Sequence, residues 1–517
     1  MRAMACSPYI LAMIAAPVRT YEFIDSPVVI PANARLRWFG YVTVTLLLLG
    51  GGLRAIPLFQ DRPLWIDEAM LALNIQEKSL AELIRPLDRN QAAPFGYLLF
   101  VKLSISVLGP SEFAFRLPAF VGSLFGLLGM VFAAKRWLNP SAALLATALF
   151  AMNPMAVSYA AEVKQYAFDI AFAAFLLGLS PKPAEKPRWT LLAPVGAIAI
   201  WFSFPAVFAL FGTGIALLLR NRTEWKKLAI IFSAWLVSFA AIYLLQLKAT
   251  GQNSYLTEFW RDAFLPLSPN GVPWLIDRLT DTFGTAGGFG AEPFRAAGLA
   301  TLVGLIGLIC FWRDGMKTEV GVILGIVGSV LLASALHKYP VAGRLMAFAV
   351  PLTVLIVARG AMGIVDVLPK YRYGIAVVFI IALFPPTWES LRQFKDHPRL
   401  EELPAALKVI PSQEPLYVYN GSANAGAGPA FAFYRNRFAF ESFHLGGCFR
   451  EHPGQYESEI EEWLKSVLSK RVWVVFSHRH GDEEMRIRLI FEHFGKEVER
   501  KQCAGAAAYC YELQPKP

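Results

Sequence analysis

The sequence contains little charge for its length. Charged residues make up 17% of its 517 residues and hydrophobic residues 55%, whereas ordinary soluble domains are about 25% charged. This composition excludes a typical soluble globular protein and favours a membrane protein. The formal net charge of +10 is spread over loops beside apolar segments. No basic cluster is interleaved with aromatic residues, so nucleic acid is not an expected partner.

Cysteine is also scarce, with five residues in the chain, which excludes a disulfide-rich scaffold. Cys6 and Cys310 are isolated. Cys448, Cys503 and Cys510 lie near the C-terminus and could form one disulfide, although the sequence does not choose the pairing. Internal repeats and low-complexity tracts are missing from the sequence.

Long apolar segments, in contrast, are abundant. They recur from about residue 38 to about residue 386, and most are long enough to cross or nearly cross a bilayer. We therefore predict an α-helical polytopic membrane protein. Its transmembrane helices, about eleven in number, are expected at residues 38–56, 117–134, 142–158, 167–180, 190–203, 205–219, 228–247, 296–312, 319–336, 345–360 and 373–386.

Lys and Arg residues gather in alternate loops between these segments, and the positive-inside rule assigns those loops to the cytoplasm. Residues 1–37 then form a cytoplasmic N-terminal segment, and residues 38–387 form the membrane domain. The outer side receives Asp67, residues 159–166, residues 248–295, residues 337–344 and the C-terminal region.

Residues 388–517 have a different composition, with many charged residues and six of the seven histidines. Short buried-strand patterns at 416–419 and 472–476 alternate with amphipathic helical patterns at 456–469 and 482–495. This region is predicted to fold as a small extracytoplasmic α/β domain.

Two adjacent carboxylates, Asp67 and Glu68, follow the first apolar segment and open a helical pattern over residues 67–83. Ionised groups near hydrocarbon are costly, and such groups usually mark a functional site. Neighbours on a helix point about 100° apart, so one carboxylate should act while the other orients a partner or pairs with a cation. The alternative is that Asp67 only caps this helix through its side-chain oxygen.

The next outer segment contains Gln91 and Tyr97, which begin an apolar helical pattern over residues 94–109. Treating this helix as a full span would reverse every later loop, so we expect it to lie along the outer leaflet, with Arg116 following it. Loop residues at a helix start are the ordinary explanation for Gln91 and Tyr97.

Two further outer segments, 159–166 and 337–344, also contain charged residues. Glu162 and Tyr166 are four residues apart and are expected to share a helix face, while Lys164 points elsewhere. Lys338 and Arg344 precede another apolar segment, where they either extend their charged ends to the interface or bind a phosphate, which guanidinium does through paired hydrogen bonds.

Five short motifs therefore occur in a fixed order: Asp67-Glu68, Ala93-Pro94 with Tyr97, Arg116-Leu117-Pro118, Glu162-Val-Lys164-Gln-Tyr166, and Tyr339-Pro340 with Arg344. This order resembles that of GT-C glycosyltransferases. The closest resemblance is to the family 39 group, which includes protein O-mannosyltransferases and bacterial aminoarabinose transferases acting on lipid A. It covers about residues 38–360.

The resemblance implies a GT-C fold and an inverting glycosyltransferase of the bacterial inner membrane. Members take a sugar from a polyprenyl-phosphate donor and pass it to an acceptor hydroxyl on the outer side, so the implied partners are this donor, membrane lipids, and a lipid, glycan or protein acceptor. Some members also bind a divalent metal near the phosphate, but this sequence offers no ligand set for one. Asp67 matches the catalytic base. The implied substrate-binding residues are Glu68, Gln91, Tyr97, Glu162 and Tyr166, and the implied phosphate-binding residues are Lys164, Lys338, Arg344 and Arg116.

The alternative function is a membrane transporter or flippase for an anionic lipid-linked or sugar cargo. Transporters often show paired halves or broken helices near the bilayer midplane. This sequence shows no internal symmetry, and its polar candidate residues collect on one side, so a transferase is the favoured interpretation.

Overall fold

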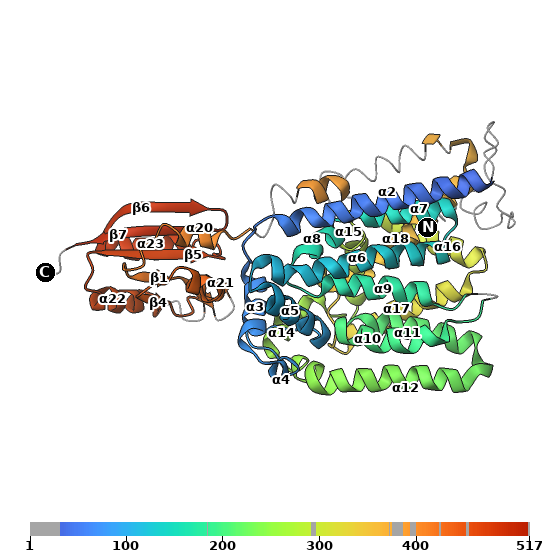
Figure 1. Ribbon diagram of the computed structural model, residues 1–517, viewed down its shortest axis with the longest axis horizontal. Coiled ribbons are helices and arrows are strands. Elements are labelled where there is room, and N and C mark those ends of the chain that lie inside the picture. The colour runs from blue at the N-terminus through green and yellow to red at the C-terminus, as the bar shows by residue number, and fades with distance from the viewer. Residues whose placement is uncertain are drawn as a thin grey trace.

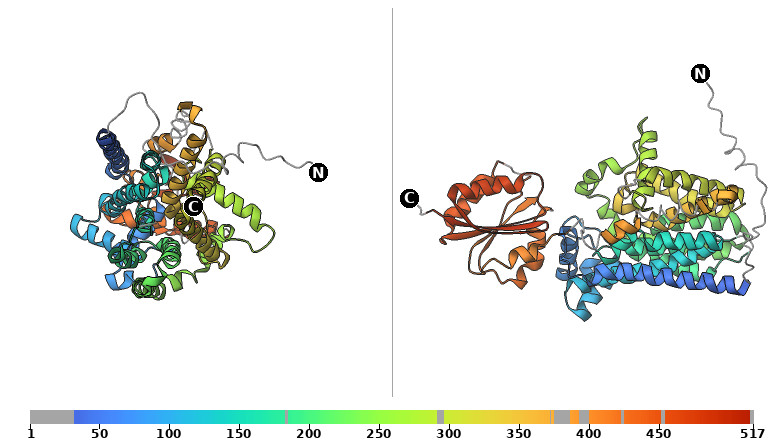
Figure 2. Two further views of the ribbon diagram at one scale, coloured as in Figure 1. Left: turned by 90° about the vertical axis from the view of Figure 1, so that its right-hand side faces the viewer. Right: turned by 90° about the horizontal axis from the view of Figure 1, so that it is seen from above.

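The protein has two parts, a helical bundle and a C-terminal α/β domain beyond one end of it (Figure 1). The same arrangement is seen from above (Figure 2, right). The computed structural model describes residues 32–182, 185–290, 296–371, 373–374, 386–392, 400–422, 425–450 and 454–514.

Ten of the eleven predicted spans coincide with described helices of the bundle, whereas the eleventh, at 373–386, lies almost wholly outside the described residues. The protein is an integral membrane protein. Within the described ranges, five helices are long and apolar enough to cross a membrane, or six if one bent pair is a single span. The bundle helices are α2 (Ala32–Phe59), α6 (Glu112–Trp137), α7 (Pro140–Ala151), α8 (Pro154–Ser158), α9 (Tyr166–Leu179), α10 (Trp189–Phe202), α11 (Ala206–Arg220), α12 (Trp225–Ile242), α16 (Ala297–Arg313), α17 (Lys317–Ala335) and α18 (Val350–Val367).

The predicted span at 142–158 is not one straight helix, because α7 and α8 are bent by 51°. The first helix ends at Ala151, and Asn153 caps the second through its side chain. Pro154 occupies the first position of α8, where its missing N–H costs nothing. Arg54 of α2 donates to the carbonyls of the last two residues of α7, at 3.0 and 2.8 Å. The carbonyl groups freed at the bend are thus satisfied inside the bundle.

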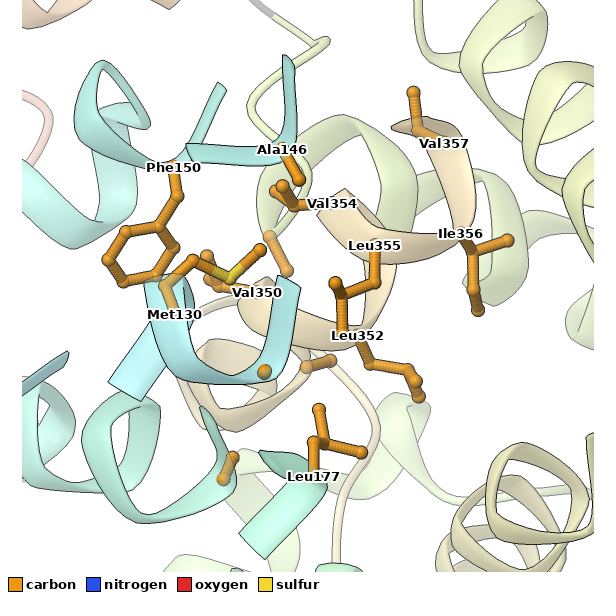
Figure 3. Close-up of a cluster of buried hydrophobic side chains, with 14 of the residues drawn as sticks. Met130, Ala146, Phe150, Leu177, Val350, Leu352, Val354, Leu355, Ile356 and Val357 are labelled. Atoms are coloured by element: carbon orange, nitrogen blue, oxygen red, sulfur yellow. The ribbon is translucent and has the colours of Figure 1, made fainter. Parts of the chain in front are cut away.

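Helix α18 forms the centre of the bundle and is apolar almost all round, as expected of a helix without a solvent face. Figure 3 shows Met130, Phe150 and Leu177, from α6, α7 and α9, beside Val350 and Leu355 of α18.

Shorter elements cover the end of the bundle that faces the C-terminal domain (Figure 1). The predicted helix at 67–83 is divided in two, because a second helix starts at Leu80 after the N-cap residue Ser79, whose N–H is accepted by Glu82. Lys102 donates to three carbonyls at the end of the first helix and so caps it. These elements are α3 (Ile66–Glu77), α4 (Leu80–Leu83), α5 (Phe95–Leu108), which lies over the predicted helix at 94–109, and α14 (Ser254–Phe259).

The C-terminal domain is built on a five-stranded sheet of order β4-β1-β5-β7-β6. Strand β1 pairs in parallel with β4 and β5, whereas β7 pairs antiparallel with β5 and β6. One face of the sheet packs on α20 and α21 and the other on α22 and α23. The elements are α20 (Leu403–Leu407), β1 (Leu416–Val418), α21 (Gly428–Tyr434), β4 (Phe443–Leu445), α22 (Tyr456–Ser466), β5 (Arg471–Ser477), α23 (Glu483–Phe494), β6 (Gly495–Cys503) and β7 (Ala506–Leu513).

Both predicted strands and both predicted helices of this domain are present. The one disulfide that the sequence allows is not formed, because Cys448, Cys503 and Cys510 are free thiols in the part of the chain that the structure describes. The domain also packs on the bundle, where the rings of Phe115 and Phe433 lie 5.6 Å apart.

Helices α16 and α18 approach each other through small residues. A Cβ atom placed on Gly360 would lie 1.9 Å from the Val303 carbonyl oxygen, and one on Gly307 would lie 2.1 Å from that of Ile356. Glycine at these positions lets the two backbones touch, as is common between membrane helices.

We predict that Gly360→Ala lowers the thermal stability of the purified protein in detergent, because overpacking costs about 1–3 kcal/mol. Gly298→Ala is the matched control on α16, since no atom lies within 4 Å of the added methyl group. The control should melt at the same temperature as the wild type or higher. Equal melting temperatures for the two variants would contradict the close contact.

Candidate active site

Asp67 lies where three distant segments meet at the end of the bundle. It is the second residue of α3, and its Oδ2 atom is 2.5 Å from Nη1 of Arg344. Its Oδ1 atom is 3.4 Å from Nζ of Lys164 and accepts a hydrogen bond of 3.2 Å from Gln91. The structure thus brings together four of the residues that the sequence singled out.

The charges around Asp67 determine its protonation. Burial alone would raise the pKa of the Asp67 carboxyl, but Lys164 and Arg344 outweigh this effect and hold the pKa below its ordinary value. Burial lowers the pKa of the Lys164 ammonium, and the charge of Asp67 partly opposes this. Lys164 also donates a 2.7 Å hydrogen bond to Gln91. Gln91 therefore links the carboxylate and the ammonium and fixes their spacing.

Arg344 reaches this site from a short turn before α18. The turn, η5 (Gly343–Ala349), is a 3-10 helix, and the Tyr339 hydroxyl braces it by donating to the Leu345 carbonyl at 2.6 Å. The guanidinium lies over the ring of Trp260, 5.9 Å from its centroid. Because the charged end is held between a carboxylate and an aromatic ring, extension to the interface does not account for its position.

Glu68 and Arg116 form a second, fully buried ion pair beside the first. Arg116 donates to both carboxylate oxygens of Glu68, at 3.0 and 2.7 Å, and to the carbonyls of Arg62 and Pro63. Glu68 also accepts the backbone N–H of Val163 at 2.9 Å. Glu68 and Arg116 were predicted to bind substrate and phosphate. Because they bind each other and the nearby backbone, we do not assign them to direct contact with the substrate.

The same contacts exclude the capping alternative for Asp67. Helix α3 begins after Trp65, and Asp67 makes no side-chain cap there. The backbone N–H of Trp65 is instead accepted by Glu68 at 3.4 Å. The prediction that one carboxylate of the pair would bind a cation structurally thus describes Glu68.

Glu162 and Tyr166 are both buried next to this centre, and the charge of Glu162 acts on Lys164 and Arg344. The expected shared helix face is wrong, because Glu162 is extended and α9 begins only at Tyr166. The ring of Tyr166 packs on that of Tyr159, with centroids 4.6 Å apart.

Two other predicted residues, Tyr97 and Lys338, are not among the partners of Asp67 described above. Tyr97 is fully buried on α5, with its ring 6.0 Å from that of Phe168. Lys338 is exposed, and the ion pairs found among the described residues do not include it. No group of three or more His, Cys, Asp or Glu residues in the described ranges could hold a metal ion.

Sequence reasoning missed two contributors to the site. Trp260 lies in a segment without a motif, and its contact with Arg344 depends on the fold. Arg62 donates to the Ala161 carbonyl at 2.9 Å, and it belongs to none of the five motifs.

We predict that Arg116→Met strongly destabilises the protein, because removing one partner leaves Glu68 buried with an uncompensated charge, at a cost of about 3–5 kcal/mol. The double variant Glu68→Leu with Arg116→Met should recover part of this loss. Arg261→Met is the control, since its pair with Glu258 is exposed and contributes about 0–1 kcal/mol. Thermal melts in detergent measure all three, and a double variant no more stable than Arg116→Met would refute the pairing.

Comparison with known proteins identifies the architecture. Residues 92–245 match the family described as dolichyl-phosphate-mannose-protein mannosyltransferase. A comparison with curated proteins finds no match. Among solved structures, the Archaeoglobus fulgidus oligosaccharyltransferase tethered with an acceptor peptide is 12% identical, with a TM-score of 0.51, over 91% of this chain and 74% of that chain. Its apo form is 13% identical, with a TM-score of 0.50, over the same shares.

ArnT from Cupriavidus metallidurans bound to undecaprenyl phosphate also matches, at 14% identity over 93% of this chain and 98% of that chain, with a TM-score of 0.44. The archaeal structures, with TM-scores of 0.50 and 0.51, have a fold similar to that of this chain. The family match is confined to residues 92–245, and the likeness to the archaeal structures shows a shared fold.

Proposed function

We propose that the protein is an inverting glycosyltransferase that moves a sugar from a polyprenyl-phosphate carrier to an acceptor hydroxyl at the outer face of the bacterial inner membrane. The observation that carries this proposal is the position of Asp67 between Lys164 and Arg344. A transfer from a lipid phosphate requires a base for the acceptor and cations for the departing phosphate, and these three side chains supply both.

Each of these three charged side chains has one role in the proposed reaction. Asp67 accepts the proton of the acceptor hydroxyl as its oxygen attacks the anomeric carbon from the face opposite the phosphate. The bond between that carbon and the phosphate oxygen breaks, and its electron pair remains on the phosphate. Arg344 and Lys164 stabilise the charge that develops there, through hydrogen bonds set in advance. The products are the glycosylated acceptor, the polyprenyl phosphate and a proton on Asp67.

The low pKa of Asp67 fits this role once the donor is bound. A carboxylate held between two cations is ionised but is a weak base. When the donor phosphate takes over part of the interaction with Arg344 and Lys164, the carboxylate loses part of its stabilisation and its proton affinity increases. Binding of the lipid phosphate therefore makes Asp67 a stronger base.

The neighbouring residues have supporting roles in this proposal. Gln91 keeps Asp67 and Lys164 at their spacing, Glu162 and Tyr166 orient the sugar or the acceptor, and Lys338 is an outer contact for the phosphate. The exposed apolar side chains of α5, among them Leu103 and Val107, support a role for this helix as a wall for the prenyl chain, with Tyr97 in its buried face.

Asp67→Asn should abolish transfer of labelled sugar from a polyprenyl-phosphate donor by the purified protein, because the amide cannot accept the proton. The expected loss is at least about 10²-fold, with an unchanged melting temperature. Asp262→Asn is the matched control, since this carboxylate also lies on the outer side but is exposed. Full activity of Asp67→Asn would remove Asp67 from the mechanism, and movement of the donor across vesicles without product would favour a transporter.

Arg344→Ala should weaken use of the donor more than use of the acceptor. Removing one preorganised donor to the phosphate typically costs about 10²–10³ in rate, and it should lower kcat/KM for the lipid donor while KM for the acceptor changes little. Arg261→Ala, an exposed arginine beside Trp260, controls for loss of surface charge. Equal losses for donor and acceptor would instead indicate a structural role for Arg344.

A further inference from the structure

The backbone just before Asp67 is held by side chains from the C-terminal domain. The Leu64 N–H donates to the Tyr434 hydroxyl at 2.7 Å, and the Ile66 N–H donates to Oε2 of Glu401 at 3.0 Å. Ile66 is the first residue of α3, so its N–H is one of those that the helix itself leaves without a partner. The C-terminal domain thus caps the helix that carries the proposed base.

Glu401 is itself firmly fixed. It is buried, and its second oxygen, Oε1, lies 2.8 Å from Nδ1 of His478. The next residue, Glu402, donates its N–H to the Ala504 carbonyl at 2.8 Å and accepts the Ala504 N–H through its side chain at 3.1 Å. Glu401 is therefore attached to the turn between β6 and β7 and to the end of β5.

The opposite side of the same backbone segment is held by the bundle. Arg116 of α6 donates to the carbonyls of Arg62 and Pro63. The first residue of α6, Glu112, forms a two-pronged ion pair with Arg437 of the C-terminal domain, at 2.8 and 3.0 Å. The backbone segment before Asp67 is consequently held by hydrogen bonds from both the bundle and the C-terminal domain, and these two parts also contact each other.

We infer that Glu401 is a positioning residue for Asp67, and that the C-terminal domain completes the geometry of the active site. This inference rests on the proposed function, because it assigns Asp67 the role of the base. Loss of the Glu401 carboxylate would release the first turn of α3, and with it a carboxylate that must lie within hydrogen-bond reach of the acceptor. A displacement of about 1 Å can cost on the order of 10²-fold in rate.

The domain contains a matched control for this contact. Glu459 also joins a histidine and a backbone N–H, with Oε1 2.9 Å from Nε2 of His444 and 3.0 Å from the N–H of Gly447. All three residues belong to the C-terminal domain. Glu401→Ala and Glu459→Ala therefore each remove a carboxylate that joins a histidine to a backbone N–H. Glu459 also accepts the Tyr417 hydroxyl at 3.3 Å, and only the change at Glu401 reaches α3.

The experiment compares the wild type with Glu401→Ala, Glu401→Gln and Glu459→Ala in full-length protein. Hydrogen exchange at the start of α3 should become faster in Glu401→Ala alone. In the transfer assay, kcat should decrease on the order of 10- to 10²-fold in Glu401→Ala, with KM for the lipid donor nearly unchanged. Glu401→Gln keeps an acceptor oxygen for the Ile66 N–H and should restore most of the rate, and Glu459→Ala should resemble the wild type.

Unchanged exchange at α3 in Glu401→Ala would overturn the inference, and so would faster exchange with an unchanged kcat. A loss of kcat in Glu459→Ala as large as that in Glu401→Ala would also overturn it, because the effect would then be one of domain stability. Failure of the proposed function is a different result, in which the wild type transfers no sugar from any lipid-phosphate donor. The exchange measurement still decides whether Glu401 holds α3.

Discussion

The arrangement at the end of the bundle that faces the C-terminal domain depends on one constraint: a charge that is removed from water must be neutralised by a partner. Two ion pairs satisfy it side by side. Glu68 and Arg116 are sealed off, with side-chain exposures of 0% and 1%, whereas Asp67 and Arg344 keep 15% and 25%. This difference separates their roles, because only a partly accessible pair can admit a substrate. The sealed pair serves as a frame for the accessible one.

The buried pair of Glu68 and Arg116 positions the active-site residues because Glu68 contacts the backbone next to them in the sequence. Glu68 directly follows Asp67, and it accepts the N–H of Val163, the residue before Lys164. A single buried carboxylate therefore fixes the backbone next to the proposed base and next to one of its cations. Since neighbours on a helix point about 100° apart, Glu68 can face inward while Asp67 faces the site. The adjacent acids are thus a device for holding one of them in place.

Hydropathy and charge were sufficient to predict most of the helices and the members of the central cluster, because both depend on the local cost of burying or exposing a side chain. The sequence did not predict which cation would pair with which carboxylate. The sequence shows that Arg116 and Arg344 are costly at a membrane edge, but it does not show that one binds Glu68 and the other Asp67. The bend between α7 and α8 and the extended backbone at Glu162 were missed for a related reason, since caps and long-range hydrogen bonds override a helical pattern there. Glu401 gave no signal because charged residues are ordinary in its region.

The membrane domain and the C-terminal domain make different contributions to the surroundings of Asp67. Helices in a bilayer satisfy their own backbone groups except at their ends, and α3 begins at such an end. The bundle provides the charges, from Asp67, Lys164 and Arg344, but the acceptors for the Leu64 and Ile66 N–H groups come from Tyr434 and Glu401. A domain whose own sheet fixes those acceptors can hold a helix end more rigidly than lipid head groups or water can. We therefore regard the C-terminal domain as part of the structure that orients Asp67, because it binds the backbone of Ile66, the residue directly before Asp67.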